Sequence, residues 1–254
     1  MRYPVLFIGG SDPSGGAGIQ ADIKSCQALG GYAMALPTAL TVQNSHGVKA
    51  LELLPPSLVA AQAEAVLSDI RPRAVKIGML GSIAIAEELA RVLARLEGEV
   101  PIILDPVLSA SSGMKLGALE AVERLLPLCT LVTPNLPEAA SILAAPAMPT
   151  PMLIQALKEA LPCAFLLKGG HGDGAVLTDW LWDGKRLTSL NARRQQGNQL
   201  HGTGCTLAAA IATELAKGKP LHLATILAHQ YLQGAIRRAA TAPLGQGHHG
   251  PLWH

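Results

Sequence analysis

Apolar and polar positions follow two rhythms along this chain, short apolar runs and longer stretches with a helical period. Short apolar runs bounded by glycine, proline or polar residues are typical of buried strands. They predict six strands, at 5–10, 35–41, 74–79, 101–106, 130–135 and 164–170. Helical periodicity predicts helices near 16–29, 56–70, 82–97, 116–127, 137–144, 151–161, 203–217 and 221–239. The alternation indicates βαβ units, and therefore an α/β fold with a parallel sheet covered by helices on both faces.

One region interrupts this alternation. Residues 174–190 contain two strand-like runs joined at Asp183-Gly184, a dipeptide typical of tight hairpin turns. The sheet is therefore expected to be mostly parallel, with an antiparallel hairpin at one edge. The polar segment that follows, 191–200, is interpreted as a loop or flap. Because no repeat or linker interrupts the chain, residues 1–254 are expected to form a single domain.

Polar residues and glycines follow the apolar run in five of the six predicted strands. These segments are 9–12, 41–44, 105–106, 133–135 and 168–170. In open parallel sheets, ligands bind outside the carboxyl ends of the strands. A turn or a helix cap explains each segment alone, but five of them at one edge of a sheet predict a ligand site.

Composition narrows the class of protein. Apolar residues make up 49% of the 254 residues and charged residues 15%, which is typical of a large buried core. A formal net charge of +2 argues against a nucleic-acid or membrane-surface protein that binds by electrostatics. No apolar stretch reaches about 18 residues, and the first ten residues resemble a strand more than a signal peptide. The four cysteines are widely spaced without a C-x-x-C pair, which favours a cytoplasmic location over a zinc site or a disulfide framework.

Two glycine-rich stretches are candidates for binding phosphate. The first, 9–22, contains a loose dinucleotide-binding pattern, but no acidic residue lies between Asp22 and Glu52 to bind a ribose, so NAD is discounted. No Walker-type motif occurs anywhere in the chain. The second stretch, 201–206, reads HGTGCT and continues into an alanine-rich helix. Its glycines allow several backbone N–H groups to point the same way, and the helix dipole adds to the attraction for an anion. A plain helix cap would explain a threonine there, but not the two glycines beside it.

Seven segments occur in an order that is specific to one group of kinases. They read GGSDPSGGAGIQAD, TALTVQN, KIGM, LDPVLSASSG, TPNLPEA, LKGGH and HGTGCTLAAAI. From residue 5 to about residue 251, the chain resembles the hydroxymethylpyrimidine/phosphomethylpyrimidine kinases of thiamine biosynthesis, in the ribokinase-like superfamily. Gly-Thr-Gly-Cys discriminates most, because most relatives in the superfamily carry Gly-x-Gly-Asp there. The resemblance implies a three-layer ribokinase-like fold, a homodimer, and two successive phosphorylations of 4-amino-5-hydroxymethyl-2-methylpyrimidine with ATP and Mg²⁺.

Phosphoryl transfer mainly requires two oxygens held in line and neutralised charge on the moving phosphoryl group. The backbone amides of Gly202, Thr203, Gly204 and Cys205 are the candidates for neutralising that charge. Lys168 directly follows a buried apolar run and is the candidate cation for the ATP phosphates.

A magnesium and water cluster is also implied by the resemblance, with the hard oxygen ligands that Mg²⁺ prefers. Its members are Asp105, Thr133, Asn135 and Glu138. Glu138 has a second explanation, because an acid in the first turn of a helix stabilises the helix N-terminus.

Three side chains are candidates for binding the pyrimidine. The amide of Gln43 offers a donor and an acceptor to a ring nitrogen and its neighbouring amine, and the resemblance implies the same role. Asp22 and Met79 are further candidates, although a helix acid and a core methionine explain them as well.

Cys205 is interpreted as the base that accepts the proton of the substrate hydroxymethyl group. Its position at a helix start, among backbone amides, predicts a lowered thiol pKa. A small residue that merely fills the turn is the alternative.

Other functions remain open at this point. A pyridoxal or pyridoxine kinase shares the implied fold and metal cluster. A cysteine hydrolase would pair Cys205 with His201, but no Asp or Asn partner for His201 can be assigned. A non-catalytic binding protein would not need Cys205, Asp105 and Lys168 together. The histidines at 248, 249 and 254 lie in a tail where we expect no metal site.

Overall fold

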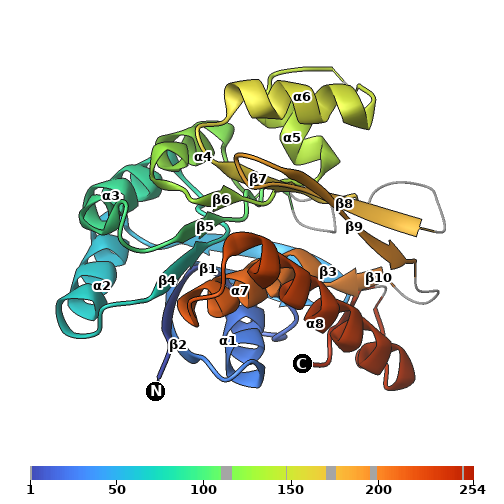
Figure 1. The fold of residues 1–254 in the computed structure, drawn as a ribbon. Helices are drawn as coiled ribbons and strands as arrows, with labels where there is room; N and C mark the ends of the chain where they lie inside the picture. Colours follow the sequence, from blue (N-terminus) through green and yellow to red (C-terminus); the bar gives the residue numbers. More distant parts are fainter. Residues whose placement is uncertain (1, 110–115, 147, 170–175, 195–198, 248) are drawn as a thin grey trace.

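A computed structural model describes residues 2–109, 116–146, 148–169, 176–194, 199–247 and 249–254. Within these ranges, nine strands form one sheet in the order β3-β2-β1-β4-β5-β6-β7-β8-β9. Helices cover both faces of this sheet (Figure 1). The three-layer α/β architecture expected from the sequence is confirmed.

Six neighbouring strands in the middle of the sheet run parallel. They are β2 (Tyr32–Asn44), β1 (Pro4–Ser11), β4 (Ala74–Ile77), β5 (Ile102–Leu104), β6 (Leu131–Val132) and β7 (Ala164–Leu167). All residues of β4, β5, β6 and β7 are buried. Strands buried on both faces have no polar side, so they occur as continuous apolar runs in the sequence.

Antiparallel hairpins lie at both edges of the sheet, rather than at one edge as expected. The predicted hairpin is formed by β8 (Val176–Trp182) and β9 (Leu187–Arg193). Its turn is at Asp183-Gly184, where Gly184 has a φ of 93° that favours glycine. The second hairpin joins β2 to β3 (Gly47–Leu53), to which the sequence analysis assigned no element. Most of β3 is exposed or half-buried, so it lacks the apolar run that identifies a buried strand.

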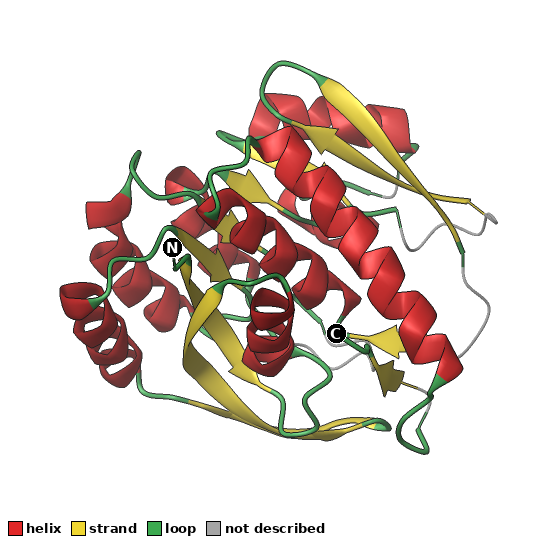
Figure 2. Cartoon of the chain, turned by 60° about the horizontal axis from the view of Figure 1, so that its bottom comes forward, coloured by secondary structure: helices red, strands yellow, loops and turns green. Residues whose placement is uncertain are grey.

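The polar segment 191–200 is also more ordered than a loop. β9 extends into it, and β10 (Gln199–His201) begins at its end. β10 pairs in parallel with β11 (His249–Pro251), near the end of the chain marked C in Figure 2. Residues 195–198 of the proposed flap, Gly170 at the end of a predicted strand, and His248 lie outside the described residues.

The helices form two layers. One layer contains α1 (Gly18–Ala28), α7 (Thr203–Ala216) and α8 (Leu221–Thr241), and the other contains α2 (Pro56–Asp69), α3 (Ile83–Leu93), α4 (Leu119–Leu125), α5 (Leu136–Ile142) and α6 (Thr150–Ala160) (Figure 1). Each predicted helix is present, with ends that differ by a few residues. Short 3-10 turns at Ala94–Leu96 and Leu126–Leu128 extend α3 and α4. Of the helices described, none is long and apolar enough to cross a membrane.

The strand order reverses beside β1, which has β2 on one side and β4 on the other. Ligands of open α/β sheets bind at such a switch point. α7 is almost entirely buried, because its many alanines let it pack closely against the sheet and α8. Its N-terminus is thereby held at the carboxyl ends of the strands.

Candidate active site

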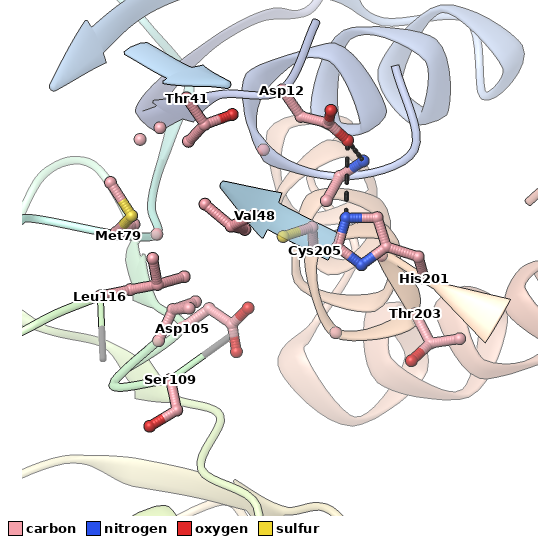
Figure 3. Close-up of a pocket in the computed structure, with 18 of the residues that line it drawn as sticks. Asp12, Thr41, Val48, Met79, Asp105, Ser109, Leu116, His201, Thr203 and Cys205 are labelled. Carbon is pink, nitrogen blue, oxygen red and sulfur yellow. Dashed lines mark hydrogen bonds and ion pairs between the residues drawn. The ribbon is translucent and has the colours of Figure 1, made fainter. Parts of the chain in front are cut away.

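A pocket of about 260 Å³ lies where the carboxyl ends of β1, β4 and β5 meet the N-terminus of α7. Figure 3 shows Asp12, Asp105, Met79, His201 and Cys205 among the side chains around it. The five polar segments predicted at strand ends all contribute to its lining, so they meet at one pocket as expected.

The start of α7 forms a cradle of backbone N–H groups. Gly202 is its N-cap, with a left-handed φ of 82° and no side-chain cap. The N–H of Thr206 donates to the carbonyl of Gly202 over 2.9 Å, which makes it the first amide satisfied within the helix. The N–H groups of Thr203, Gly204 and Cys205 precede that bond and are free of the helix ladder. The first turn therefore suits an anion, and the plain threonine cap is excluded.

Charged side chains face this cradle from β5 and β7. Lys168 Nζ donates to Asp105 Oδ1 over 2.7 Å, and Thr133 Oγ1 donates to the same oxygen over 2.9 Å. A Cβ atom at Gly204 would lie 3.3 Å from Nζ of Lys168 and 3.5 Å from Oδ2 of Asp105. Glycine at this position thus keeps the cradle open to both charges.

The charge state of this pair follows from its surroundings. Burial alone would raise the pKa of Asp105, but the Lys168 and Lys76 ammonium groups hold it below its usual value. Burial alone would lower the pKa of Lys168, but Asp105 and Glu138 hold it above its usual value. Lys168 is therefore a fixed cation at neutral pH.

The helix-cap explanation of Glu138 is confirmed, and its place in a metal cluster stays a prediction. Its carboxylate accepts from the N–H of Asn135 and its own N–H donates to the Asn135 side chain, each over 2.8 Å, which forms a capping box on α5. Glu138 also lines the pocket, 3.9 Å from Nζ of Lys168. Burial raises its pKa.

The four predicted metal ligands are brought together, but they contribute to the site in different ways. The bonds above use Oδ1 of Asp105 and Oε2 of Glu138, which leaves one oxygen of each carboxylate for a cation within the described part of the chain. Asn135 lines the pocket, whereas Thr133 supports Asp105 from behind. Mg²⁺ binds one or two carboxylates and keeps waters or phosphate oxygens, so this donor set fits it.

Asp22 is not part of the pocket wall, contrary to the prediction. It lies on the inner face of α1 with no exposed surface, and both of its oxygens bind Lys76 Nζ, over 3.0 and 2.9 Å. Lys76 lines the pocket in its place. Sequence reasoning missed Lys76, although a lysine inside the apolar run AVKI was a usable signal, because a fully buried lysine needs an acidic partner.

The prediction that the Cys205 thiol has a lowered pKa is wrong. Removal from water raises the pKa of Cys205 to about 11, and Asp22 and Asp105 add to the rise. The Lys76 ammonium and a hydrogen bond from the Gly18 N–H act in the opposite direction but are outweighed. The helix-start argument failed because it left out burial and these two carboxylates, which lie far away in sequence.

The predicted pyrimidine ligand Gln43 lies in the pocket wall beside two polar side chains. Its Oε1 accepts from Thr41 Oγ1 over 3.2 Å, and its Nε2 lies 2.5 Å from Nε2 of His201. The same His201 nitrogen lies 3.5 Å from Asp12 Oδ2, as the dashed line in Figure 3 marks. His201 therefore lies beside an amide and an acidic side chain, neither of which the sequence analysis assigned to it.

Apolar side chains form the remaining wall. Met79 was predicted there, and Val48 and Leu116 join it (Figure 3). Val107 also lines the pocket. Val48 belongs to β3, the strand that sequence reasoning missed. A wall of this kind suits the faces of a small aromatic ring.

Comparisons with known proteins agree with this geometry. Residues 12–253 match the family profile described as phosphomethylpyrimidine kinase. The hydroxymethylpyrimidine/phosphomethylpyrimidine kinase of Rhizobium meliloti (strain 1021) is 44% identical over 266 residues, which cover 100% of this chain and 97% of that protein.

Two solved structures show the same fold. The phosphomethylpyrimidine kinase of Clostridium difficile 630 has a TM-score of 0.79 and 37% identity, covering 92% of this chain and 100% of that one. The pyridoxal kinase of Staphylococcus aureus in complex with ADP has a TM-score of 0.87 and 30% identity, covering 100% and 94%.

Proposed function

This chain belongs to the phosphomethylpyrimidine kinase family, and from this premise we propose how its pocket carries out the reaction. It is a hydroxymethylpyrimidine/phosphomethylpyrimidine kinase of thiamine biosynthesis with a ribokinase-like fold. ATP phosphorylates 4-amino-5-hydroxymethyl-2-methylpyrimidine and then its monophosphate. One observation carries the assignment of residues: the Gln43 amide and the α7 amide cradle open into the same pocket.

The pyrimidine binds between the apolar wall and Gln43 in this proposal. Its ring nitrogen and the adjacent amino group need a donor beside an acceptor, which a side-chain amide supplies. Met79 and Val48 lie against the ring faces. Asp22 acts on the pocket only through Lys76, whose ammonium it holds in place.

The phosphoryl group passes along the start of α7. The substrate oxygen attacks the γ-phosphorus, a new O–P bond forms, and the bond from phosphorus to the β,γ-bridging oxygen breaks to release ADP. The N–H groups of Thr203, Gly204 and Cys205, with Gly202 as the turn that aims them, stabilise negative charge on the moving group. Lys168 neutralises charge on the ATP phosphates from the opposite side.

Cys205 accepts the hydroxymethyl proton in the first phosphorylation. With a pKa of about 11, the thiol is protonated at neutral pH, so the reaction starts from a minor thiolate form. Lys76 and the Gly18 N–H stabilise that form. In the second phosphorylation the nucleophile is a phosphate oxygen that carries no proton, so no base is needed.

Magnesium supplies charge neutralisation on the ATP phosphates when it is bound. Asp105 and Glu138 would hold it with their remaining carboxylate oxygens. Thr133 keeps Asp105 in place, and Asn135 keeps Glu138 in place through the capping box.

A homodimer is the proposed assembly, and the cytoplasm the proposed compartment. Leu40 and Val42 on β2 expose 49% and 58% of their surface, on an edge hairpin that a second copy would cover. All four cysteines are free thiols, as is usual for cytoplasmic proteins.

A coupled ADP-release assay on hydroxymethylpyrimidine, its monophosphate and pyridoxine tests the function. We expect turnover of both pyrimidines with magnesium, loss of turnover with EDTA, and recovery when magnesium is restored. Pyridoxine is included as the third substrate because pyridoxal kinases share this fold. Ready turnover of pyridoxine with none of either pyrimidine would make the pyridoxine kinase alternative correct.

A further inference from the structure

His201 is a half-buried polar residue that the proposed reaction does not use. It ends β10, lines the pocket, and has only 13% of its side chain exposed. Its Nε2 lies 2.5 Å from Nε2 of Gln43 and 3.5 Å from Oδ2 of Asp12. Its position beside the proposed pyrimidine ligand raises the question of what it does there.

The proton on the imidazole ring can be assigned from the two partners. With the amide nitrogen of Gln43 facing Nε2 of His201, that ring nitrogen accepts, and this arrangement has the ring proton on Nδ1. The contact with Asp12 is long for a hydrogen bond. Oδ2 of Asp12 is moreover satisfied by the N–H groups of Gly16 and Ala17, at 3.0 and 2.8 Å.

In this arrangement the bonds to His201 and Thr41 leave one atom group of each kind on the Gln43 amide facing the pocket. One N–H of the amide is used by His201, and one lone pair of its oxygen is used by Thr41. What remains is one N–H beside one lone pair, the arrangement that matches a ring nitrogen flanked by an amino group. A rotation of the amide by about 180° would exchange the two and set acceptor against acceptor.

We propose that His201 is a positioning residue that fixes the orientation of the Gln43 amide and thereby sets the selectivity for an aminopyrimidine. The inference rests on the proposed role of Gln43. An amide that is already oriented loses less conformational freedom when substrate binds, so the effect falls on binding rather than on the phosphoryl-transfer step.

Residues 245–247 and 249–254 contact the chain on both sides of this pair. β11 pairs with β10, and its Pro251 lies opposite His201. The N–H of Gly247 donates to Ser45 Oγ over 3.1 Å, two residues beyond Gln43. Leu252, next to Pro251, is buried. This segment therefore connects the turn that follows Gln43 to the strand that carries His201.

Kinetics of three variants test the inference on two substrates, hydroxymethylpyrimidine and its analogue without the amino group. His201→Phe keeps a ring and removes the acceptor, whereas His201→Gln restores an acceptor oxygen at similar reach. For His201→Phe we expect KM for hydroxymethylpyrimidine to rise about tenfold, with kcat within about threefold of wild type. Discrimination against the analogue should fall by a similar factor, and His201→Gln should recover most of it. His222→Phe, an exposed histidine replaced on α8, is the matched control and should behave as wild type.

A double-mutant cycle with Gln43→Ala provides the second measurement. If His201 acts through Gln43, adding His201→Phe to Gln43→Ala should change KM little further, because the residue to be positioned is absent. Additive effects, or wild-type selectivity in His201→Phe, would overturn the inference. Should His201→Phe fail to fold, His201→Ala serves as the acceptor-free variant in the same cycle. A wild-type enzyme that does not phosphorylate hydroxymethylpyrimidine would instead refute the proposed function.

Discussion

At the residue scale, the proposed role of the Cys205 thiol distinguishes the first phosphorylation from the second. Cys205→Ala should lower kcat for hydroxymethylpyrimidine by about 10²–10⁴-fold, because the proton loses its acceptor. The same variant should affect the monophosphate much less, since that nucleophile carries no proton. Steady-state kinetics on both substrates measure the ratio, and an equal loss on both would leave Cys205 as a packing residue.

The raised pKa of the Cys205 thiol also predicts that the rate of the first phosphorylation depends on pH. Because the pKa is about 11, the thiolate fraction at pH 7–9 is small and grows about tenfold per pH unit. The rate of the first phosphorylation should therefore rise with pH across this range. Cys205→Asp supplies a carboxylate that is already ionised, so its profile should be flat. A flat wild-type profile would contradict the thiolate route.

Helix α7 offers a matched pair of glycines at the element scale. Gly202 at its start and Gly218 just beyond its end share a φ of 82°. A Cβ at Gly218 would meet no atom within 4 Å, whereas one at Gly202 would collide with the carbonyl oxygen of Gly16. The two positions therefore share backbone strain but differ in packing.

Alanine at each position separates these two effects. Gly218→Ala should lower the free energy of unfolding by about 1 kcal/mol and leave the kinetics unchanged. Gly202→Ala should lower it further and also raise KM for ATP, because the cradle N–H groups shift. Chemical denaturation and kinetics of both variants provide the measurement. Equal behaviour of the two variants would show that contact with Gly16 does not position the cradle.

At the scale of the whole molecule, the two edge hairpins allow the proposed homodimer to be tested. Val42 on β2 and Val176 on β8 are exposed to 58% and 56% of their surface. Val42→Glu should dissociate the proposed homodimer, because an unpaired carboxylate buried in an interface costs several kcal/mol. Val176→Glu, at the other edge, should leave the assembly intact. Sedimentation equilibrium measures both, and a monomeric wild-type protein would contradict the proposal.

Sequence alone determined most of this architecture. Continuous apolar runs such as those of β4 and β7 identify strands buried on both faces, and polar residues after them mark the carboxyl ends where a ligand binds. The HGTGCT turn before α7 and the capping box at Asn135 and Glu138 are local features, encoded within a few residues. Local patterns of this kind can be recognised in the sequence because the interactions that cause them lie within one turn of helix or one strand.

Tertiary structure alone decided the charges and partners in the pocket. Asp22 meets Lys76 across 54 positions, and His201 meets Gln43 across 158, so no spacing in the sequence predicts either pair. The pKa of Cys205 rises because burial and the carboxylates of distant segments outweigh the local helix start. Strand β3 was missed because its pairing with β2, rather than an apolar run of its own, defines it. A side chain's electrostatics depends on which groups surround it in space, and that is known only once the whole chain has folded.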